Sequence, residues 1–462
     1  MESVEYDIVV VGGGSAGYAC ASFARSAGAE VAIVDAGPLG GLCILRGCMP
    51  TKAILRSSDV ISLLNRSREF GLLPVEARAD LSAIIDRKNA LIREFADYRI
   101  EQLRDERFTL YEERASFISP TELKAGSHIL KARKGFVIAT GSKVADFPIP
   151  GLDSTACITS DEALELRDPP KSMIVLGGGP VALELAQFYC RIGVDVSLIQ
   201  RSSHIMSSGD EDLARPVEER LREEGMKVFT GTAIRKVENR GEEKILHFSH
   251  GGEEKQVSAN AILQALGRKP NIDGLGLDLA GVETDGRKIL VNEEMRTSRN
   301  NIFAVGDVNG RHEIVHIAIQ QGEIAAHNLV HGDRAAKKED SRLKTSVVFT
   351  DPAVASLGLS EKECREKNIP YLAASHPFAD HGKSMCLGEI HGHVKILCDP
   401  ASGEIIGAHI VGPEAGELIH ELIAVMHFKG KVQDLAQMPH YHPTLAEILT
   451  YPAEELAEKM LA

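Results

Sequence analysis

Short apolar runs alternate with glycine-rich turns and mixed helical segments in the first part of the chain. Residues 6–11 are apolar apart from Asp7, and a helix-like stretch covers residues 18–27. A second apolar run, 31–34, ends on Asp35. Continuous apolar runs of this length are typical of strands that are buried on both faces of a parallel sheet. The pattern therefore predicts a strand, a helix and a second strand of an α/β fold.

The same unit occurs a second time. Apolar runs at 173–176 and 194–199 flank a helix-like stretch at 183–192. The turns after the first strand of each copy hold Gly12, Gly14 and Gly17, and Gly177, Gly179 and Ala182, respectively. Gly12 to Asp35 and Gly177 to Gln200 span the same number of positions, so the duplication is in register. Such turns let the backbone approach a pyrophosphate at a helix N-terminus, which predicts two bound dinucleotides.

The two copies differ where the second strand ends. Asp35 provides the carboxylate that suits free ribose hydroxyls, whereas Gln200 provides none. Arg201 could instead pair with a 2′-phosphate, which favours NADP over NAD for the second copy. The alternative is that Arg201 is a solvated loop residue.

Cys43 and Cys48 are separated by four residues and follow shortly after the first glycine turn. Pro50 opens an apolar run that predicts a helix, with Cys48 at its N-terminus. The helix dipole stabilises a thiolate there, and Lys52 lies one turn further on. We interpret the pair as redox-active thiols beside a dinucleotide. One alternative is a zinc site, but the chain has no second pair of cysteines at matching spacing. The other alternative is that both cysteines are unconnected thiols buried in the core.

Composition excludes several classes of function. The formal charge of −14 argues against nucleic-acid and anionic-membrane partners. No apolar run is long enough to cross a bilayer, and the acidic N-terminus does not resemble a signal peptide. The cysteines are too few and too scattered for a disulfide scaffold. We expect a cytoplasmic protein of about three domains.

The last part of the chain has a different pattern. Residues 135–142, 260–271 and 302–307 are further strand-like segments that end in small or polar residues. After a charged patch at 332–342, strand-like segments at 346–349, 394–398 and 405–411 alternate with helix-like segments at 361–367 and 414–429. This order predicts a C-terminal α+β domain.

Together these residues resemble the class I pyridine-nucleotide–disulfide oxidoreductases over essentially the whole chain. Besides the two glycine turns and the cysteine pair, the markers are Ala139-Thr140-Gly141, Gly267-Arg268, Gly306-Asp307 and His442-Pro443-Thr444. The resemblance implies an α/β fold with two Rossmann-like dinucleotide-binding domains and a C-terminal α+β dimerisation domain. It places an FAD-binding domain at 1–149 and 271–341, an NAD(P)-binding domain at 150–270 and the dimerisation domain at 342–462.

The resemblance also implies cofactor contacts. FAD is expected on the first unit and on Asp307, and NAD or NADP on the second. The residues expected to bind the two cofactors are Gly12, Gly14, Gly17, Asp35, Ala139, Thr140, Gly141, Gly306, Asp307, Gly177, Gly179, Ala182, Gln200, Arg201, Gly267 and Arg268. No metal is expected.

Catalytic roles follow from the same resemblance. Cys48 is expected beside the flavin, and Cys43 is expected to form the mixed disulfide with substrate. Lys52 is expected near the flavin and paired with Glu184. His442, oriented by Glu447, would be the base and would come from the other subunit of a homodimer. Thr444 to Glu447 also matches a capping box before a helix, which is a purely structural alternative for Glu447.

Three members of the family compete. Dihydrolipoyl dehydrogenases match the cysteine motif and the His-x-His-Pro-Thr-Leu-x-Glu ending, and are the leading interpretation. Mercuric reductases end in a vicinal cysteine pair, whereas this chain ends Met460-Leu461-Ala462. Glutathione reductases usually have Tyr where Pro180 stands. The expected substrate is a small-molecule or protein-bound disulfide, with a lipoyl group as one candidate. A flavoprotein redox sensor without a dedicated disulfide substrate is the alternative of a different class.

Overall fold

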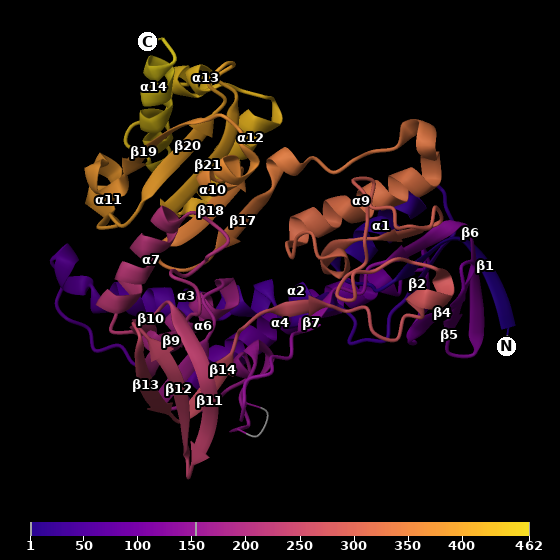
Figure 1. Ribbon diagram of the computed structural model, residues 1–462, viewed down its shortest axis with the longest axis horizontal. Coiled ribbons are helices and arrows are strands. Elements are labelled where there is room, and N and C mark those ends of the chain that lie inside the picture. The colour runs from indigo at the N-terminus through magenta and orange to yellow at the C-terminus, as the bar shows by residue number, and fades with distance from the viewer. Residues whose placement is uncertain (1, 153–154, 462) are drawn as a thin grey trace. The chain divides into compact units, whose positions relative to one another are not determined.

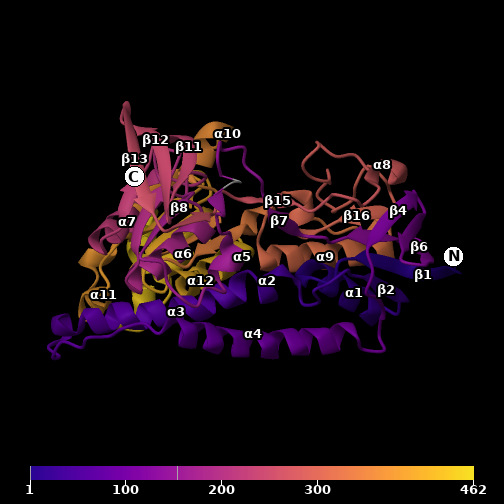
Figure 2. The same cartoon turned by 90° about the horizontal axis from the view of Figure 1, so that it is seen from below.

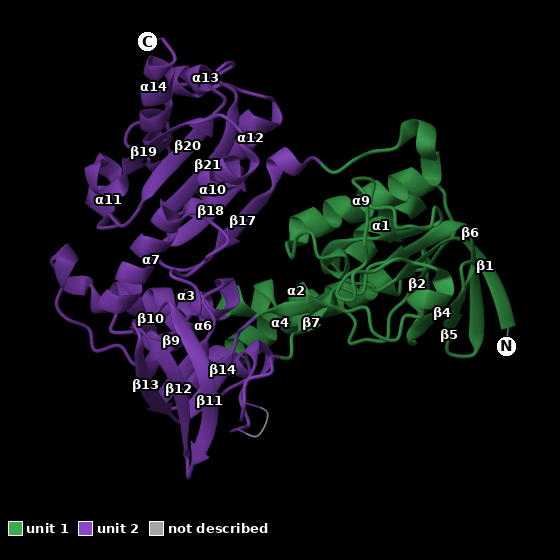
Figure 3. Cartoon of the chain, viewed as in Figure 1, with its two compact units in different colours: residues 1–53, 86–146, 267–339 green, residues 54–85, 147–266, 340–462 purple. Residues whose placement is uncertain are grey.

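The computed structural model describes residues 2–152 and 155–461 (Figure 1). Its chain divides into two compact units, coloured separately in Figure 3. Unit 1 comprises residues 1–53, 86–146 and 267–339, and unit 2 comprises residues 54–85, 147–266 and 340–462. Within the described ranges, no helix is both long and apolar enough to cross a membrane.

Unit 1 is built on a mixed sheet with strand order β3-β2-β1-β6-β5-β4 and with β16 beside β6. The strands β3, β2, β1, β6 and β16 are parallel, and β4, β5 and β6 form an antiparallel meander. The bounds are β1 (Glu2–Val11), β2 (Val31–Val34), β3 (Thr109–Tyr111), β4 (Ala115–Ser119), β5 (Glu122–Ala125), β6 (His128–Ile138) and β16 (Ile302–Ala304). Helices α1 (Ser15–Ser26) and α9 (Val315–His331) share one apolar core with this sheet.

The strand, helix and strand predicted at the N-terminus are confirmed, but two of the predicted limits are wrong. β1 begins at Glu2 rather than residue 6, because residues 2–6 pair in parallel with residues 128–132 of β6. α1 begins at Ser15 rather than residue 18, since Gly14 is its N-cap and the glycine turn leads directly into the helix. The turn is therefore part of the helix terminus.

The segment that holds Cys43 and Cys48 leads into two long helices. Short α2 (Gly41–Leu45) precedes α3 (Cys48–Asn65), and α4 (Leu81–Leu103) follows along the chain (Figure 2). In unit 1 the Arg87 guanidinium donates to the Ala53 carbonyl at 2.9 Å. In unit 2, Ile54 and Leu55 share a buried cluster with Leu81 and Ile85.

Unit 2 contains the second α/β repeat. Its parallel sheet has the order β10-β9-β8-β14, from β8 (Ser172–Leu176), β9 (Asp195–Ile199), β10 (Lys227–Phe229) and β14 (Ala261–Gln264). Helices α5 (Ser160–Ala163), α6 (Pro180–Arg191) and α7 (Glu211–Glu223) accompany it. An antiparallel sheet of β11 (Thr232–Arg240), β12 (Glu243–His250) and β13 (Glu253–Ala259) follows β10. The predicted repeat is confirmed, although α6 begins three residues earlier than predicted, directly after Gly179.

The single strand predicted at 260–271 is wrong, because two strands of different sheets occupy it. β14 ends at Gln264, and β15 (Arg268–Pro270) pairs with β7 (Ser142–Val144) in unit 1. Gly267 lies between them with φ +135°, a conformation that other residues rarely adopt. The backbone turns at this glycine and leaves one sheet for the other.

The C-terminal α+β region is confirmed. Its antiparallel sheet has the order β17-β18-β21-β20-β19. The strands are β17 (Thr345–Val348), β18 (Ala353–Gly358), β19 (Leu372–Pro377), β20 (His393–Cys398) and β21 (Ile405–Gly412). The helices are α10 (Glu361–Lys367), α11 (Gly382–Leu387), α12 (Ala415–His427), α13 (Val432–Gln437) and α14 (Thr450–Lys459). Buried apolar residues of several of these helices and strands pack together in one cluster.

A buried lysine connects this C-terminal sheet to the segment after β9. Lys395 is 3% exposed, and its ammonium donates to Asp210 at 2.9 Å, to Asp212 at 2.8 Å and to Glu361 at 3.1 Å. Burial alone would raise the pKa of Asp212, but hydrogen bonds from His393 and Lys395 lower it well below its usual range. The network stabilises the folded state above about pH 4, the ordinary pKa of an aspartate, and the stabilisation is lost as the pH falls below that value.

We predict that Lys395→Met lowers the stability of the protein by about 3–5 kcal/mol, because it leaves the buried Asp210 carboxylate, and the partly exposed Asp212 and Glu361, without their cation. At roughly 2–4 °C per kcal/mol this corresponds to a fall in Tm of about 10 °C, measured by circular dichroism at pH 7.

The matched control is Lys227→Met. Lys227 pairs with Asp195 at 2.8 Å with both side chains 55% exposed, so its loss should cost no more than about 1 kcal/mol. The difference in Tm between Lys395→Met and Lys227→Met should become smaller below pH 4. Equal Tm values for them at pH 7 would contradict the role of the buried network.

Candidate active site

Both cysteines of the pair lie on helices, at positions that belong to unit 1. Cys43 is in the middle of α2, and Cys48 is the first residue of α3, so its predicted place at a helix N-terminus is confirmed. Lys52 follows one turn later on α3. Both cysteines are partly buried.

Two glycines allow this segment to pack closely. A Cβ at Gly41 would lie 2.8 Å from the Cα of Gly14, the N-cap of α1. A Cβ at Gly47 would lie 3.2 Å from the Cα of Cys43 and 3.1 Å from the carbonyl oxygen of Leu42. Gly41 therefore brings the thiol segment against the first glycine turn, and Gly47 folds α3 back onto the helix that carries Cys43.

The two thiols interact directly. A hydrogen bond between the Cys43 and Cys48 side chains, together with burial, raises the pKa of Cys43 well above the usual range of a thiol. The positive charge of Lys52 acts in the opposite direction on Cys43. The raised pKa favours the protonated form of the Cys43 thiol.

The first glycine turn has the geometry of a phosphate-binding site. Gly12 has φ +105°, and a Cβ there would lie 2.4 Å from the Ala139 carbonyl oxygen. A Cβ at Gly17 would lie 1.8 Å from the Gly12 carbonyl oxygen. Gly14 differs, because its nearest neighbour would be Gly41 at 3.9 Å. The chain itself leaves the space beside Gly14 open at the helix N-terminus, where backbone N–H groups bind phosphate.

The second turn, in unit 2, repeats this arrangement. Gly177 has φ +119°, and a Cβ there would lie 2.4 Å from the Ala265 carbonyl oxygen. Gly179 is the N-cap of α6, and a Cβ there would meet no atom within 4 Å. Ala182, at the position of Gly17, is fully buried. The structure thus confirms that the two turns are equivalent, with an open helix N-terminus in each.

The residues that end the second strands also take equivalent places. The Asp35 carboxylate accepts from the Gly13 N–H at 2.6 Å and from the Gly37 N–H at 2.8 Å. The Gln200 side chain lies against Gly178, the counterpart of Gly13, and donates to the His204 carbonyl at 3.4 Å. The next residue, Arg201, is exposed. Sequence reasoning did not anticipate that Asp35 also stabilises its own glycine turn.

Two predicted cofactor-binding residues meet through a residue that sequence reasoning missed. Ser142 donates to Asp307 at 2.7 Å and accepts from the Arg268 guanidinium at 2.9 Å. Behind them, the side chain of Gln321 accepts from the Gly306 N–H at 2.8 Å in the core. Arg268, a predicted cofactor-binding residue, lies in unit 1 with Asp307.

The small-residue turn after β6 is held by Asn271. The Thr140 hydroxyl donates to the Asn271 carbonyl at 2.8 Å, and the Asn271 N–H donates to the Gly141 carbonyl at 2.9 Å. The Ala139 N–H donates to the Val11 carbonyl at 2.8 Å. The predicted segments around residues 140 and 271 therefore adjoin the first glycine turn.

His442 and Glu447 form the predicted pair in unit 2. His442 Nδ1 lies 2.9 Å from Glu447 Oε1, and the imidazole is 83% exposed. The other oxygen of Glu447 accepts from the Thr444 N–H at 2.8 Å, which is the capping box before the 3₁₀ helix η7 (Leu445–Leu449). Glu447 thus makes the contacts of both interpretations, one with each oxygen, and its catalytic role stays a prediction. These contacts lower the pKa of Glu447, the Thr444 N–H first and His442 second.

Glu184 is 3% exposed and accepts from the Phe349 N–H at 3.0 Å. The predicted pair of Glu184 with Lys52 joins residues of the two units and stays a prediction.

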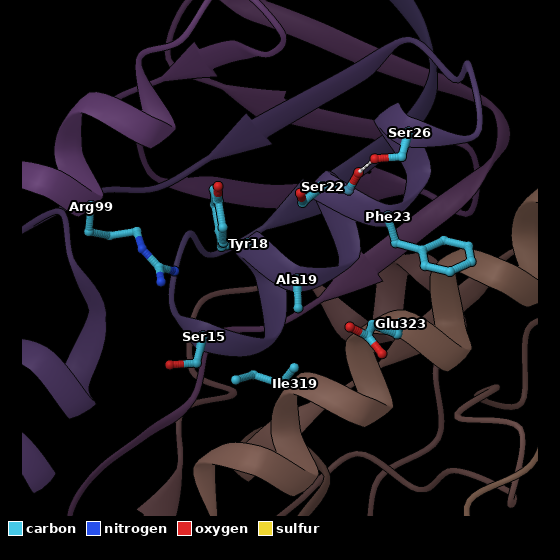
Figure 4. Close-up of a pocket in the computed structure, with 9 residues that line it drawn as sticks. All are labelled: Ser15, Tyr18, Ala19, Ser22, Phe23, Ser26, Arg99, Ile319 and Glu323. Atoms are coloured by element: carbon cyan, nitrogen blue, oxygen red, sulfur yellow. Dashed lines mark hydrogen bonds between the residues drawn. The ribbon is translucent and has the colours of Figure 1, made fainter.

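A cavity of about 380 Å³ lies along the outer side of α1 (Figure 4). Arg99 of α4 stacks on the ring of Tyr18 at 4.1 Å along its wall. Its remaining lining residues are Ser15, Ala19, Ser22, Phe23, Ser26, Ile319 and Glu323. None of these is a predicted site residue.

Comparison with known proteins gives matches over the whole chain. Residues 6–322 match the model of the pyridine nucleotide-disulphide oxidoreductases, and residues 345–453 match the dimerisation domain of the same proteins. A dihydrolipoyl dehydrogenase from Thermus scotoductus is 34% identical over 99% of this chain and 98% of its own length. A mercuric reductase from Staphylococcus aureus is 33% identical over 97% of this chain and 82% of its own length.

Solved structures agree on the fold. The HOCl-induced flavoprotein disulfide reductase RclA from Escherichia coli, as its Cu(II) complex, superposes with a TM-score of 0.86 and 23% identity, over 98% of this chain and 99% of its own. The matched family models, the relatives above 30% identity and the thiol pair packed beside the first of two equivalent glycine turns lead to one conclusion: the chain belongs to the pyridine nucleotide–disulfide oxidoreductase family.

Proposed function

We propose that the chain is an NADPH-dependent, FAD-containing disulfide reductase that acts as a homodimer. Members of the family use FAD and NAD(P), and FAD when bound carries two electrons between the nicotinamide and the thiol pair. The observation that carries the proposal is the packing of Gly41 on Gly14, which holds Cys43 and Cys48 beside an open phosphate-binding helix terminus.

The cofactor contacts proposed here follow the geometry. FAD would lie on the turn at Gly12, Gly14 and Gly17, with Asp35 at the ribose and Asp307 further along the same unit. The nicotinamide nucleotide would lie on Gly177, Gly179 and Ala182. We retain the domain limits 1–149, 150–270, 271–341 and 342–462 as part of the proposal.

The proposed reaction is thiol–disulfide exchange. Cys43 gives its proton to His442 of the partner subunit and attacks one sulfur of the substrate, forming a mixed disulfide while the other sulfur leaves and takes the proton from His442. Cys48 then attacks the Cys43 sulfur, which breaks the mixed disulfide and forms the Cys43–Cys48 disulfide, and the second substrate sulfur leaves and takes up the proton that Cys48 lost. The substrate gains two electrons and the pair loses two. The raised pKa of Cys43 supports the need for a base.

The dihydrolipoyl dehydrogenase and the mercuric reductase have nearly the same sequence identity to this chain. We therefore base the proposed substrate on sequence motifs instead. The His-x-His-Pro-Thr-Leu-x-Glu ending favours a lipoyl-type disulfide, whereas Arg201 favours NADPH. Parallel assays of lipoamide, glutathione disulfide and Hg(II), each with NADPH and NADH, separate the candidates. The predicted cytoplasmic location stays a prediction.

We predict that two-electron reduction gives a long-wavelength thiolate-to-flavin absorption band that Cys48→Ser abolishes. Cys43→Ser should keep the band without added reductant, because it leaves the Cys48 thiolate without a disulfide partner. Both variants should lose disulfide reduction. The measurement is an anaerobic titration followed by absorbance. A band that survives in Cys48→Ser, or is absent from the wild type, would contradict the assigned roles.

We predict that Gly41→Ala reduces the FAD content of the purified protein, because the new methyl group meets Gly14 at the helix terminus. Gly28→Ala is the matched control, since Gly28 has φ +86° against +78° for Gly41 but no atom lies within 4 Å of its Cβ. Both variants carry a backbone penalty of about 1–2 kcal/mol. The ratio of flavin to protein absorbance reports the result, and equal ratios would argue against the proposed FAD site.

We predict that Arg201→Ala raises the KM for NADPH about 10- to 100-fold and leaves that for NADH unchanged. A charge-assisted hydrogen bond to the 2′-phosphate is worth about 1.5–3 kcal/mol, or one to two powers of ten. Arg215→Ala, an exposed arginine of α7 paired with Glu211, is the control. An equal effect on both nucleotides would contradict the 2′-phosphate contact.

A further inference from the structure

A buried histidine that the proposed reaction does not use lies behind the His442–Glu447 pair. His381 is 2% exposed and lies between the 3₁₀ helix η6 (Phe378–Asp380) and α11. Its Nδ1 is 2.8 Å from the hydroxyl of Ser384, which is itself completely buried. A polar ring with so little access to solvent is fixed by its partners rather than by water.

An aromatic stack connects His381 to the turn that carries Glu447. The edge of His381 meets the ring of Tyr451 at a centroid distance of 6.2 Å and an angle of 77°. On Tyr451, His376 of β19 stacks at 4.2 Å and an angle of 10°, and the Nε2 of His376 lies 3.0 Å from the Asp380 carbonyl. Tyr451 is the second residue of α14 and lies one turn after Glu447.

The backbone completes this connection. The Thr450 hydroxyl, at the start of α14, donates to the Glu447 carbonyl at 2.9 Å. The Tyr451 ring therefore sets the start of α14, and the start of α14 sets the turn of Glu447. Glu447 in turn divides its two oxygens between His442 Nδ1 and the Thr444 N–H.

Charges around His381 come from this same group of residues. Burial lowers the pKa of His381, the Glu447 carboxylate raises it, and His376 and His442 lower it further. The lowered pKa favours the neutral form of the His381 imidazole.

We infer that His381 is a positioning residue for the acid–base pair: through Ser384 and the Tyr451 ring it fixes the orientation of Glu447 and so sets the basicity of His442. The catalytic importance of this role rests on the proposed function. The positioning itself concerns only the His442–Glu447 pair. Neither the glycine turns nor the thiol pair contains His381, so the inference adds a determinant from a different element.

The test compares His381→Ala with His381→Gln in the FAD-containing dimer. The pKa of His442 is measured by NMR on protein labelled with ¹³C at histidine, with the His442 signal assigned from its loss in His442→Asn. Loosening Glu447 should lower the pKa of His442 in His381→Ala by about 0.5 unit, the size of one exposed ion pair. His381→Gln keeps a neutral hydrogen-bonding side chain and should restore the wild-type value.

The pH profile of disulfide reduction gives the second readout. Its acidic limb should shift with the NMR value in His381→Ala, while the rate at which NADPH reduces the flavin stays unchanged. If His381→Ala does not fold, Ser384→Ala, which removes one hydrogen bond without opening a large cavity, should shift the His442 pKa in the same direction.

An unchanged His442 pKa in the folded variants, His381→Ala or Ser384→Ala, overturns the inference. If the wild type reduces no disulfide but the pKa still shifts, the proposed function fails and the positioning role stands. A shifted pKa that His381→Gln does not restore also overturns the inference, because a neutral hydrogen-bonding side chain would then not be what the pair requires.

Discussion

A side chain at residue 41 would overlap the backbone of Gly14, where α1 begins. The chain can therefore bring the cysteine segment onto the first glycine turn only through a residue without a Cβ. The rest of the proposed chemistry depends on this approach, since a thiol pair exchanges electrons with a dinucleotide only when the two are in contact. The same contact leaves Gly14 with an open side, because Gly41 presents no atoms that would fill the phosphate position.

Sequence periodicity predicted the two α/β repeats, the C-terminal α+β region and the helix that starts at Cys48. These features depend on residues that are close together in the sequence, so the local pattern of apolar and polar residues is enough to predict them. The glycine motif also predicted the open space beside Gly14 and Gly179. Almost no protein atom lies near these two N-cap residues, so packing does not require glycine there, whereas binding of a phosphate does.

The residues that sequence reasoning missed act over long separations. Ser142 joins Asp307 to Arg268, and Lys395 gathers carboxylates from α7 and α10. A lone serine or lysine carries no periodic signal, and its role exists only after the sheets have formed. The break at Gly267, which returns the chain to unit 1 and divides the strand predicted at 260–271, also depends on sheets that are distant in sequence. His381 was missed because a single histidine beside a glycine fits no motif.

Glu447 gives one carboxylate oxygen to an imidazole and the other to the first turn of a helix. Loss of this side chain therefore removes a charge partner and a helix cap together, and the cap alone is worth about 1 kcal/mol. A reduced rate in a Glu447 variant would combine a folding defect with a chemical one and could not be assigned to either. His442 is different, because its exposed ring makes no hydrogen bond to the backbone in the described structure. A substitution of His442 therefore tests proton transfer more directly than a substitution of Glu447, which orients it.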